Sequence, residues 1–100
     1  MWQKALQLHG GGNTKSVEGS LNVSNYGHAE IDIFSNNIGM IHFITDDKSY
    51  YAIWKLEGTT FSKINGNATS EPFTFSDNKM IINIKTPSTV TFTYVIGEVL

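Results

Sequence analysis

The densest apolar pattern in the chain runs from Ile38 to Glu57 and predicts a β-hairpin. Both halves are rich in aromatic and β-branched residues, which suit a pleated surface, and the polar residues 46–49 between them have the length of a hairpin loop. Each half is apolar on both faces, whereas one face of a small antiparallel sheet normally meets water. The second apolar face therefore needs a cover, from this chain or from another copy of it.

The two faces of this hairpin are expected to have different roles. Trp54 shares a strand face with other apolar residues, which predicts that it lies in the core. The face opposite Trp54 carries the candidate interface or ligand-binding residues, which are Phe43, Tyr51 and Ile53. Exposed aromatic side chains stack on sugar rings and also anchor protein interfaces, and the sequence leaves both uses open beside plain burial in the core.

Further segments carry apolar residues at strand spacing and predict short strands at 2–8, 16–24, 28–35, 59–64, 73–75, 79–85 and 89–96. Turn-forming residues separate these segments, among them Asn25-Tyr26-Gly27, Asn36-Asn37 and Asp77-Asn78. Asn-Gly is the strongest two-residue hairpin signal, so we also expect the chain to reverse at Asn65-Gly66.

Eight or nine short strands with turn signals between them indicate a single all-β domain that spans residues 1–100. We expect an antiparallel β-sandwich with a jelly-roll-like arrangement and almost no helix. Residues that share an apolar strand face predict a core consisting of Leu21, Ile31, Ile33, Trp54, Ile82, Phe92 and Tyr94.

Composition narrows the classes of function. The chain has no cysteine, which excludes disulfides and thiolate chemistry, and no arginine, the residue best suited to bidentate recognition of phosphate. Since the formal net charge is −2, we expect no nucleic-acid partner. No stretch approaches the ~20 apolar residues that span a bilayer, and the first residues lack the apolar run of a secretory signal. We therefore expect neither membrane insertion nor a signal peptide.

No residues stand at the spacing of a metal or cofactor site. The histidines are isolated from one another and from any ligand motif, and they are His9, His28 and His42. Aspartates on flexible loops bind calcium, but the calcium-loop pattern is absent, so solvated positions are favoured for Asp32, Asp46, Asp47 and Asp77. We expect no metal and no cofactor.

Nothing in the sequence points to catalysis. Glu30 and Asp32 share a strand face and could flank a glycosidic bond, but outward charge on a strand is the ordinary case. No nucleophile motif is present, and the glycines at 10–12 lack the ending of a phosphate-binding loop. We therefore expect a non-enzymatic protein without catalytic residues.

Several segments together carry a resemblance to a known group of proteins: the start MWQKALQLHGGGN, the Asn/Ser/Thr-rich body with the strands IHFIT and YYAIWKLEG, and the closing segments KMIINIKTP and TVTFTYVIGEVL. With these segments the chain resembles the small trimeric β-sandwich knobs and fibre-associated proteins of bacteriophage virions, including tail-fibre, head-fibre and receptor-binding knobs. The resemblance extends over the full length and assigns no site residues. It implies that sister subunits around a threefold axis cover the second apolar face.

We therefore expect a virion structural or attachment protein that forms a homo-oligomer, with a trimer favoured. Its partners are expected to be other virion proteins or cell-surface glycans, and its location the virion or the extracellular space after synthesis in the cytoplasm. The alternative is a monomeric carbohydrate-binding module whose exposed aromatics line a sugar groove. An oligomer in solution favours the first hypothesis and a monomer the second.

Overall fold

The computed structural model describes residues 15–69 and 71–99. These residues contain eight strands and no helix, so the all-β prediction is confirmed for this part of the chain. The strand predicted at 2–8, the glycines at 10–12 and His9 lie outside the described residues. The strands are β1 (Ser16–Val23), β2 (His28–Asp32), β3 (Asn37–Thr45), β4 (Tyr51–Glu57), β5 (Thr60–Gly66), β6 (Phe73–Ser76), β7 (Lys79–Asn83) and β8 (Val90–Glu98).

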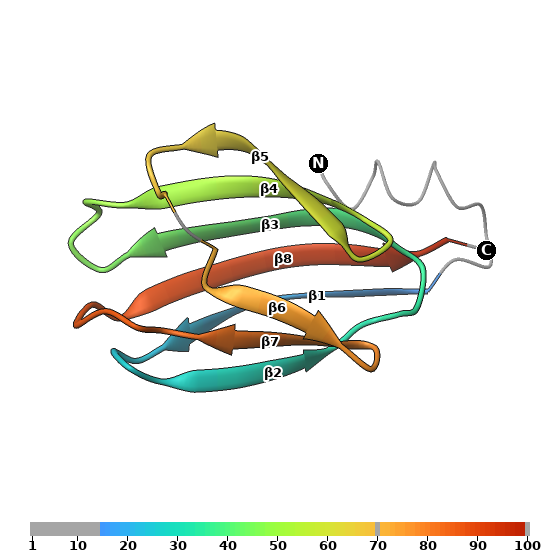
Figure 1. Cartoon of the computed structure of the whole chain (residues 1–100), viewed down its shortest axis with the longest axis horizontal. Helices are drawn as coiled ribbons and strands as arrows, with labels where there is room; N and C mark the ends of the chain where they lie inside the picture. The colour runs from blue at the N-terminus through green and yellow to red at the C-terminus, as the bar shows by residue number, and fades with distance from the viewer. Residues whose placement is uncertain (1–14, 70, 100) are drawn as a thin grey trace.

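The strands form two sheets in which every pairing is antiparallel. The larger sheet has the order β1-β8-β3-β4-β5 and the smaller one the order β2-β7-β6. In Figure 1 the strands of both sheets run along the long dimension of the molecule. The connections β1–β2, β3–β4, β5–β6 and β7–β8 therefore gather at one end, which we call the loop end. Residues of both sheets contribute to one hydrophobic core.

Aromatic rings cross this core and join the sheets. Trp54 on β4 stacks on Phe43 of β3 with the ring centroids 5.3 Å apart, and it meets the edge of Phe73 on β6 at 4.9 Å. Such pairs contribute about 0.5–1.5 kcal/mol each beyond the area they bury, so they hold the two sheets together. We name the connected set the aromatic column, and it consists of Phe43, Trp54, Phe61, Phe73, Phe75 and Phe92.

Most of the predicted core is confirmed. The buried members are Ile31, Ile33, Trp54, Ile82 and Phe92. Leu21 and Tyr94 are half-buried and pack against the core. Leu21 lies on the edge strand β1, and the ring of Tyr94 lies over Gly19 of that strand, where no side chain flanks it.

The hairpin of β3 and β4 is confirmed, but the prediction that Phe43 lies on the face opposite Trp54 is wrong. The register pairs Phe43 with Ala52 and Ile41 with Trp54, so these four side chains share the inner face. Phe43 is only 6% exposed. Alternation along a strand shows which of its residues share a face, but the register between two strands depends on the conformation of their connection. Both strands are apolar on both faces, so the sequence pattern could not decide the register.

The predicted reversal at Asn65-Gly66 is also wrong. The chain reverses between β4 and β5 at Gly58-Thr59, where Gly58 has a φ of 63°. Asn65 and Gly66 instead complete β5 beyond a register shift, and Ile64 falls between the two registers as a β-bulge. Gly66 has a positive φ of 121° at the end of β5, where the chain leaves for the smaller sheet and does not form a hairpin turn.

The turn at Asp77-Asn78 is confirmed. Both residues have positive φ, 49° and 62°, which is the backbone of a type I′ turn between two twisted strands. Asp and Asn tolerate this left-handed conformation better than other residues with side chains. The turn therefore joins β6 to β7 without a glycine.

The buried amide of Asn37 ties together the end of the molecule away from the loop end. Its Nδ2 donates to the carbonyl oxygens of Phe34 at 2.6 Å and Gly58 at 2.9 Å, and its Oδ1 accepts from the Phe34 N–H at 2.9 Å. The backbone oxygen of Asn37 accepts from the Gly58 N–H. The crossover from β2 to β3 is thus fastened to the β4–β5 turn by a side chain that is only 1% exposed.

Replacing Asn37 with Ala is expected to destabilise the fold by about 3 kcal/mol, because it leaves buried backbone groups without partners. Urea unfolding monitored by tryptophan fluorescence measures the change. Asn36→Ala is the matched control, since the exposed side chain of Asn36 donates a single 3.3 Å hydrogen bond within the described part of the chain, to the Val99 oxygen. Equal losses for the two variants would contradict the assigned role of Asn37.

Trp54→Ala is expected to cost about 3–5 kcal/mol, since it removes the central ring of the aromatic column and leaves a cavity. Trp54 is 1% exposed, and its Nε1 makes no hydrogen bond with the described residues. Trp54→Phe keeps a ring and removes the unpaired donor, so it should cost less than half as much. Thermal unfolding of both variants tests this ranking.

Candidate functional site

The outward face of the larger sheet carries an apolar band along β3. Neighbours on β4 and β8 share the rows of this band, because the register places Ile53 beside His42 and Val95 beside Met40. These side chains are half-buried, apart from that of Val95, which is buried. We name the band the outer stripe, and it consists of Ile38, Met40, His42, Ile44, Ile53 and Val95.

Polar margins flank the outer stripe on both sides. On the β1 side, the Ser20 hydroxyl lies 3.4 Å from that of Thr93, and the hydroxyl of Thr91 donates to Asn22 at 2.7 Å. On the β4 side, Lys55 forms a 2.8 Å ion pair with Glu57. The face therefore has an apolar centre and a polar rim, which is the arrangement of protein–protein interfaces.

Two of the three candidate residues belong to this face. Ile53 lies in the outer stripe, and Tyr51, 37% exposed, sits beside Ile44 at its loop end. Phe43 does not join them, because it lies in the core. Sequence reasoning missed His42, the cross-strand neighbour of Ile53, although the alternation within β3 contains the signal for it. It also missed Val95, which lies beside Met40 on the other side of β3.

His42 sits among the apolar side chains of the outer stripe. Burial lowers its pKa, because the charged imidazolium loses water there. A surface that covered the stripe would remove more water from His42 and lower its pKa further.

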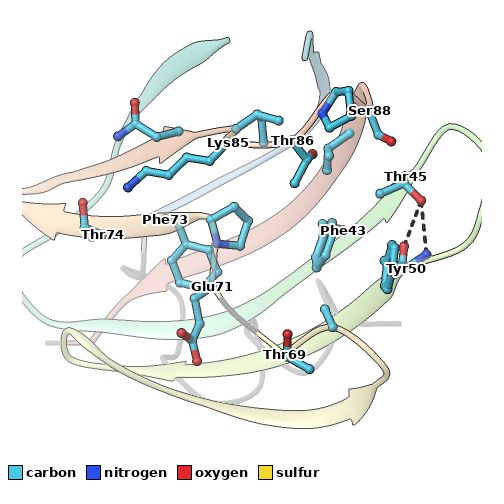
Figure 2. Close-up of a pocket in the computed structure, with 16 residues that line it drawn as sticks. Phe43, Thr45, Tyr50, Thr69, Glu71, Phe73, Thr74, Lys85, Thr86 and Ser88 are labelled. Atoms are coloured by element: carbon cyan, nitrogen blue, oxygen red, sulfur yellow. Dashed lines mark hydrogen bonds between the residues drawn. The ribbon is translucent and has the colours of Figure 1, made fainter. Parts of the chain in front are cut away.

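A cleft of about 630 Å³ opens at the loop end. Its floor is apolar and includes two rings of the aromatic column, Phe43 and Phe73. Figure 2 shows Phe43 in the middle of the view, with Thr45 and Tyr50 on one side and Glu71 and Phe73 on the other. Polar side chains form the rim, and they include Tyr50, Glu71, Thr74, Asn83, Lys85 and Ser88.

Backbone and side-chain hydrogen bonds connect the loops around this cleft. The Asp46 N–H donates to the Thr89 oxygen at 2.9 Å, which links the β3–β4 loop to the β7–β8 loop. Asn67 Nδ2 donates to the Ser49 oxygen at 2.8 Å and links the segment after β5 to the same hairpin. The β3–β4 loop itself is closed by Asp47, whose carboxylate accepts from the Ser49 N–H and the Thr45 hydroxyl. These two bonds lower the pKa of Asp47.

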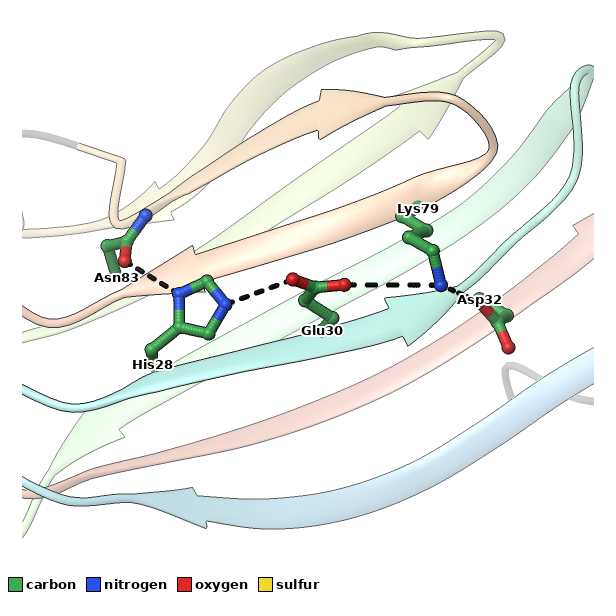
Figure 3. A network of polar contacts seen from close by, with 5 residues as sticks. All are labelled: His28, Glu30, Asp32, Lys79 and Asn83. Atoms are coloured by element: carbon green, nitrogen blue, oxygen red, sulfur yellow. Dashed lines mark hydrogen bonds and ion pairs between the residues drawn. The ribbon is translucent and has the colours of Figure 1, made fainter.

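A polar network covers the outward face of the smaller sheet (Figure 3). His28 donates from Nδ1 to Asn83 Oδ1 at 2.9 Å and from Nε2 to Glu30 at 3.1 Å, and Lys79 donates to Asp32 at 2.7 Å. Bonds to Asn83 and then to Glu30 raise the pKa of His28, because both ring nitrogens donate only in the charged form. Glu30 and Asp32 are thus engaged in exposed ion pairs and do not line the cleft.

Among residues 15–69 and 71–99, no three His, Cys, Asp or Glu side chains gather as a metal-binding group. The same residues contain no helix long and apolar enough to cross a membrane. No protein-family model, curated protein sequence or solved structure matches the chain. Function is therefore argued from the surfaces described above.

The two described histidines should titrate on opposite sides of the ordinary pKa of 6.5, His28 above it and His42 below it. The stabilisation of the folded state by His28 is then full below pH 6.5 and is lost as the pH rises through its raised pKa. The contribution of His42 has the opposite dependence, because it is present above pH 6.5 and is lost as the pH falls through its lowered pKa. NMR titration of the imidazole carbon protons measures both values. Glu30→Gln should lower the pKa of His28 alone, and a His42 pKa above that of His28 would contradict the assignment.

Proposed function

We propose that this chain is a non-enzymatic structural or attachment protein of a bacteriophage virion and that it assembles through the outer stripe into a homo-oligomer, with a trimer favoured. The observation that carries the proposal is the apolar band on a sheet face that the smaller sheet does not cover. Apolar side chains of a β-sheet need a cover, and a second copy supplies one of matching dimensions.

The size of the outward face bears on such an interface. The five strands of the larger sheet have seven to nine residues each. Strands about 4.8 Å apart that rise about 3.3 Å per residue then give this sheet an area of roughly 630 Å². A standard interface buries about 800 Å² per partner. The outward face of this sheet is therefore somewhat smaller than a standard interface, and a contact through it depends on good packing at its centre.

The charges on the margins favour a threefold arrangement. Glu18 on β1 and Lys55 on β4 stand in the same row of the sheet, because Val95 and Met40 lie between them in register. Around a threefold axis parallel to β3, the β1 margin of one copy meets the β4 margin of the next at the same height. Glu18 of one copy then approaches Lys55 of the next, which favours this pairing over contact between like charges.

For the fold, we propose a jelly-roll-like sandwich. The pairings β1·β8 and β2·β7 support it, since they place the first and last strands side by side in both sheets. The order β8-β3-β4-β5 also follows a Greek key, in which a strand returns after a long connection to lie beside the first of three hairpin-connected strands. β6 departs from a regular jelly roll because it pairs with β7 alone.

The competing hypothesis is a monomeric carbohydrate-binding module. The loop-end cleft favours it, because the exposed ring of Tyr50 stands beside polar side chains there. A monomer at high concentration would support this alternative.

Ile53→Lys and Tyr51→Lys are each expected to shift the oligomer toward monomer, because the new charge would be buried without a partner at the contact. Light scattering coupled to size exclusion at ~100 μM, above the dissociation constant of any stable assembly, measures the mass. Tyr26→Lys makes the same change at an exposed tyrosine remote from the outer stripe and should leave the mass unchanged.

Two results would go against the proposal. A monomeric unmodified protein at this concentration removes the interface and leaves the carbohydrate-binding module. A dimer preserves the outer stripe as the contact but overturns the threefold arrangement.

A further inference from the structure

We infer that the loop-end cleft binds a neutral, hydroxyl-rich glycan, with the ring of Tyr50 as the stacking surface for one pyranose unit. The inference rests on the proposed attachment role and deepens it by naming the ligand class. It uses a different surface from the outer stripe, so binding and assembly can be measured separately.

The cleft has the form of a built site. Its volume of about 630 Å³ lies within the range of small-molecule pockets, which combine an apolar lining with a few polar groups. The floor rings Phe43 and Phe73 are buried members of the aromatic column and are held by their neighbours. Hydrogen bonds between the surrounding loops fix the walls, so a ligand would meet a preformed surface.

Several polar groups of the rim have no hydrogen-bond or ion-pair partner among the described residues, whereas Asn83 accepts from His28. With the described residues, the side chains of Thr74, Thr86 and Ser88 make no hydrogen bond, and those of Glu71 and Lys85 make no ion pair. On the outward faces of the sheets, by contrast, hydroxyl and charged groups are largely paired with each other. Donors and acceptors are therefore available where the loops surround the apolar floor.

The charges of the rim favour a neutral ligand. One carboxylate, Glu71, and one ammonium, Lys85, line the cleft, so their charges balance. An anion would meet Glu71 and a cation would meet Lys85, whereas sugar hydroxyls donate to the first and accept from the second. A carbohydrate matches this mixture of an apolar floor and neutral or balanced polar groups.

Tyr50 supplies the stacking surface. Its backbone is anchored to Thr45, whose N–H donates to the Tyr50 oxygen at 3.0 Å and whose Oγ1 accepts from the Tyr50 N–H at 3.2 Å. Its side chain is 58% exposed at the cleft and contacts no other aromatic ring of the described residues. A fixed backbone with a free ring is suited to stacking on the apolar face of a pyranose.

The test is an NMR titration of the isotope-labelled full chain with lactose, maltose, cellobiose and N,N′-diacetylchitobiose, each to about 10 mM, which reaches the millimolar affinities of weak sites. At least one sugar should shift the backbone amides of residues 46–50, 84–86 and 88 in a saturable manner. Tyr50→Ala should weaken that binding about tenfold, through loss of the stacking contact. Tyr50→Phe keeps the ring and should retain most of the affinity.

Matched variants separate the possible outcomes. Tyr26→Ala removes another exposed tyrosine that does not line the cleft, and it should leave the affinity unchanged. Lys85→Gln should change the affinity less than about threefold for a neutral sugar, which loses only one of several hydrogen bonds. No saturable shift with any of the four sugars, or shifts confined to the outer stripe, would overturn the inference.

The same samples distinguish this inference from the proposed assembly. A trimer that binds no sugar keeps the assembly and rejects the glycan site. A monomer whose cleft binds sugar rejects the assembly and leaves the glycan site standing.

Discussion

The packing of the two sheets against each other depends on the contact between Trp54 and Phe73. These rings meet edge to face at 4.9 Å, one from the larger sheet and one from the smaller. Their size sets the spacing of the layers, and the remaining rings of the aromatic column fill the space on either side. Two features of the surface follow from this one contact. Phe43 and Phe73 extend to the loop end as the floor of the cleft. The outer stripe lies on the opposite face of the larger sheet, away from the aromatic column.

Period-two alternation predicted most strands well because one face of each packs on the core, whereas β5 contributes only the half-buried Phe61. The faces of Ile31 and Ile33 on the β2 segment and of Ile82 on β7 were therefore correct. Alternation failed where both faces of a strand are apolar, because it cannot then distinguish the inner face from the outer one. The β3–β4 pair is apolar on both faces, so the position of Phe43 relative to Trp54 depended on the loop, where Lys48 adopts a φ of 62°. At Asn65-Gly66 the hairpin signal was misleading, because Gly66 alone of the two adopts a positive φ and does so at a bulged strand end instead of a turn.

The candidate surfaces were harder to predict from the sequence than the strands. Ile53 and Tyr51 could be assigned to an outward face from alternation alone. Val95 of the outer stripe, by contrast, comes from β8, more than forty residues away in the chain. The cleft is harder still, because Tyr50, Glu71 and Lys85 meet only through the directions in which successive strands run. No local motif marks such a site. Its residues become neighbours once the order of the sheets is known.

The bulge at Ile64 has a consequence for how the molecule avoids uncontrolled growth. Both edge strands of the larger sheet, β1 and β5, present backbone groups to which another chain could add a strand. Open-ended fibres require the β1 edge of one molecule to pair with the β5 edge of the next, repeatedly and in the same sense. The register shift in β5 interrupts the regular ladder that such pairing needs. Continuous stacking of sheets edge to edge is thereby disfavoured at the β5 edge.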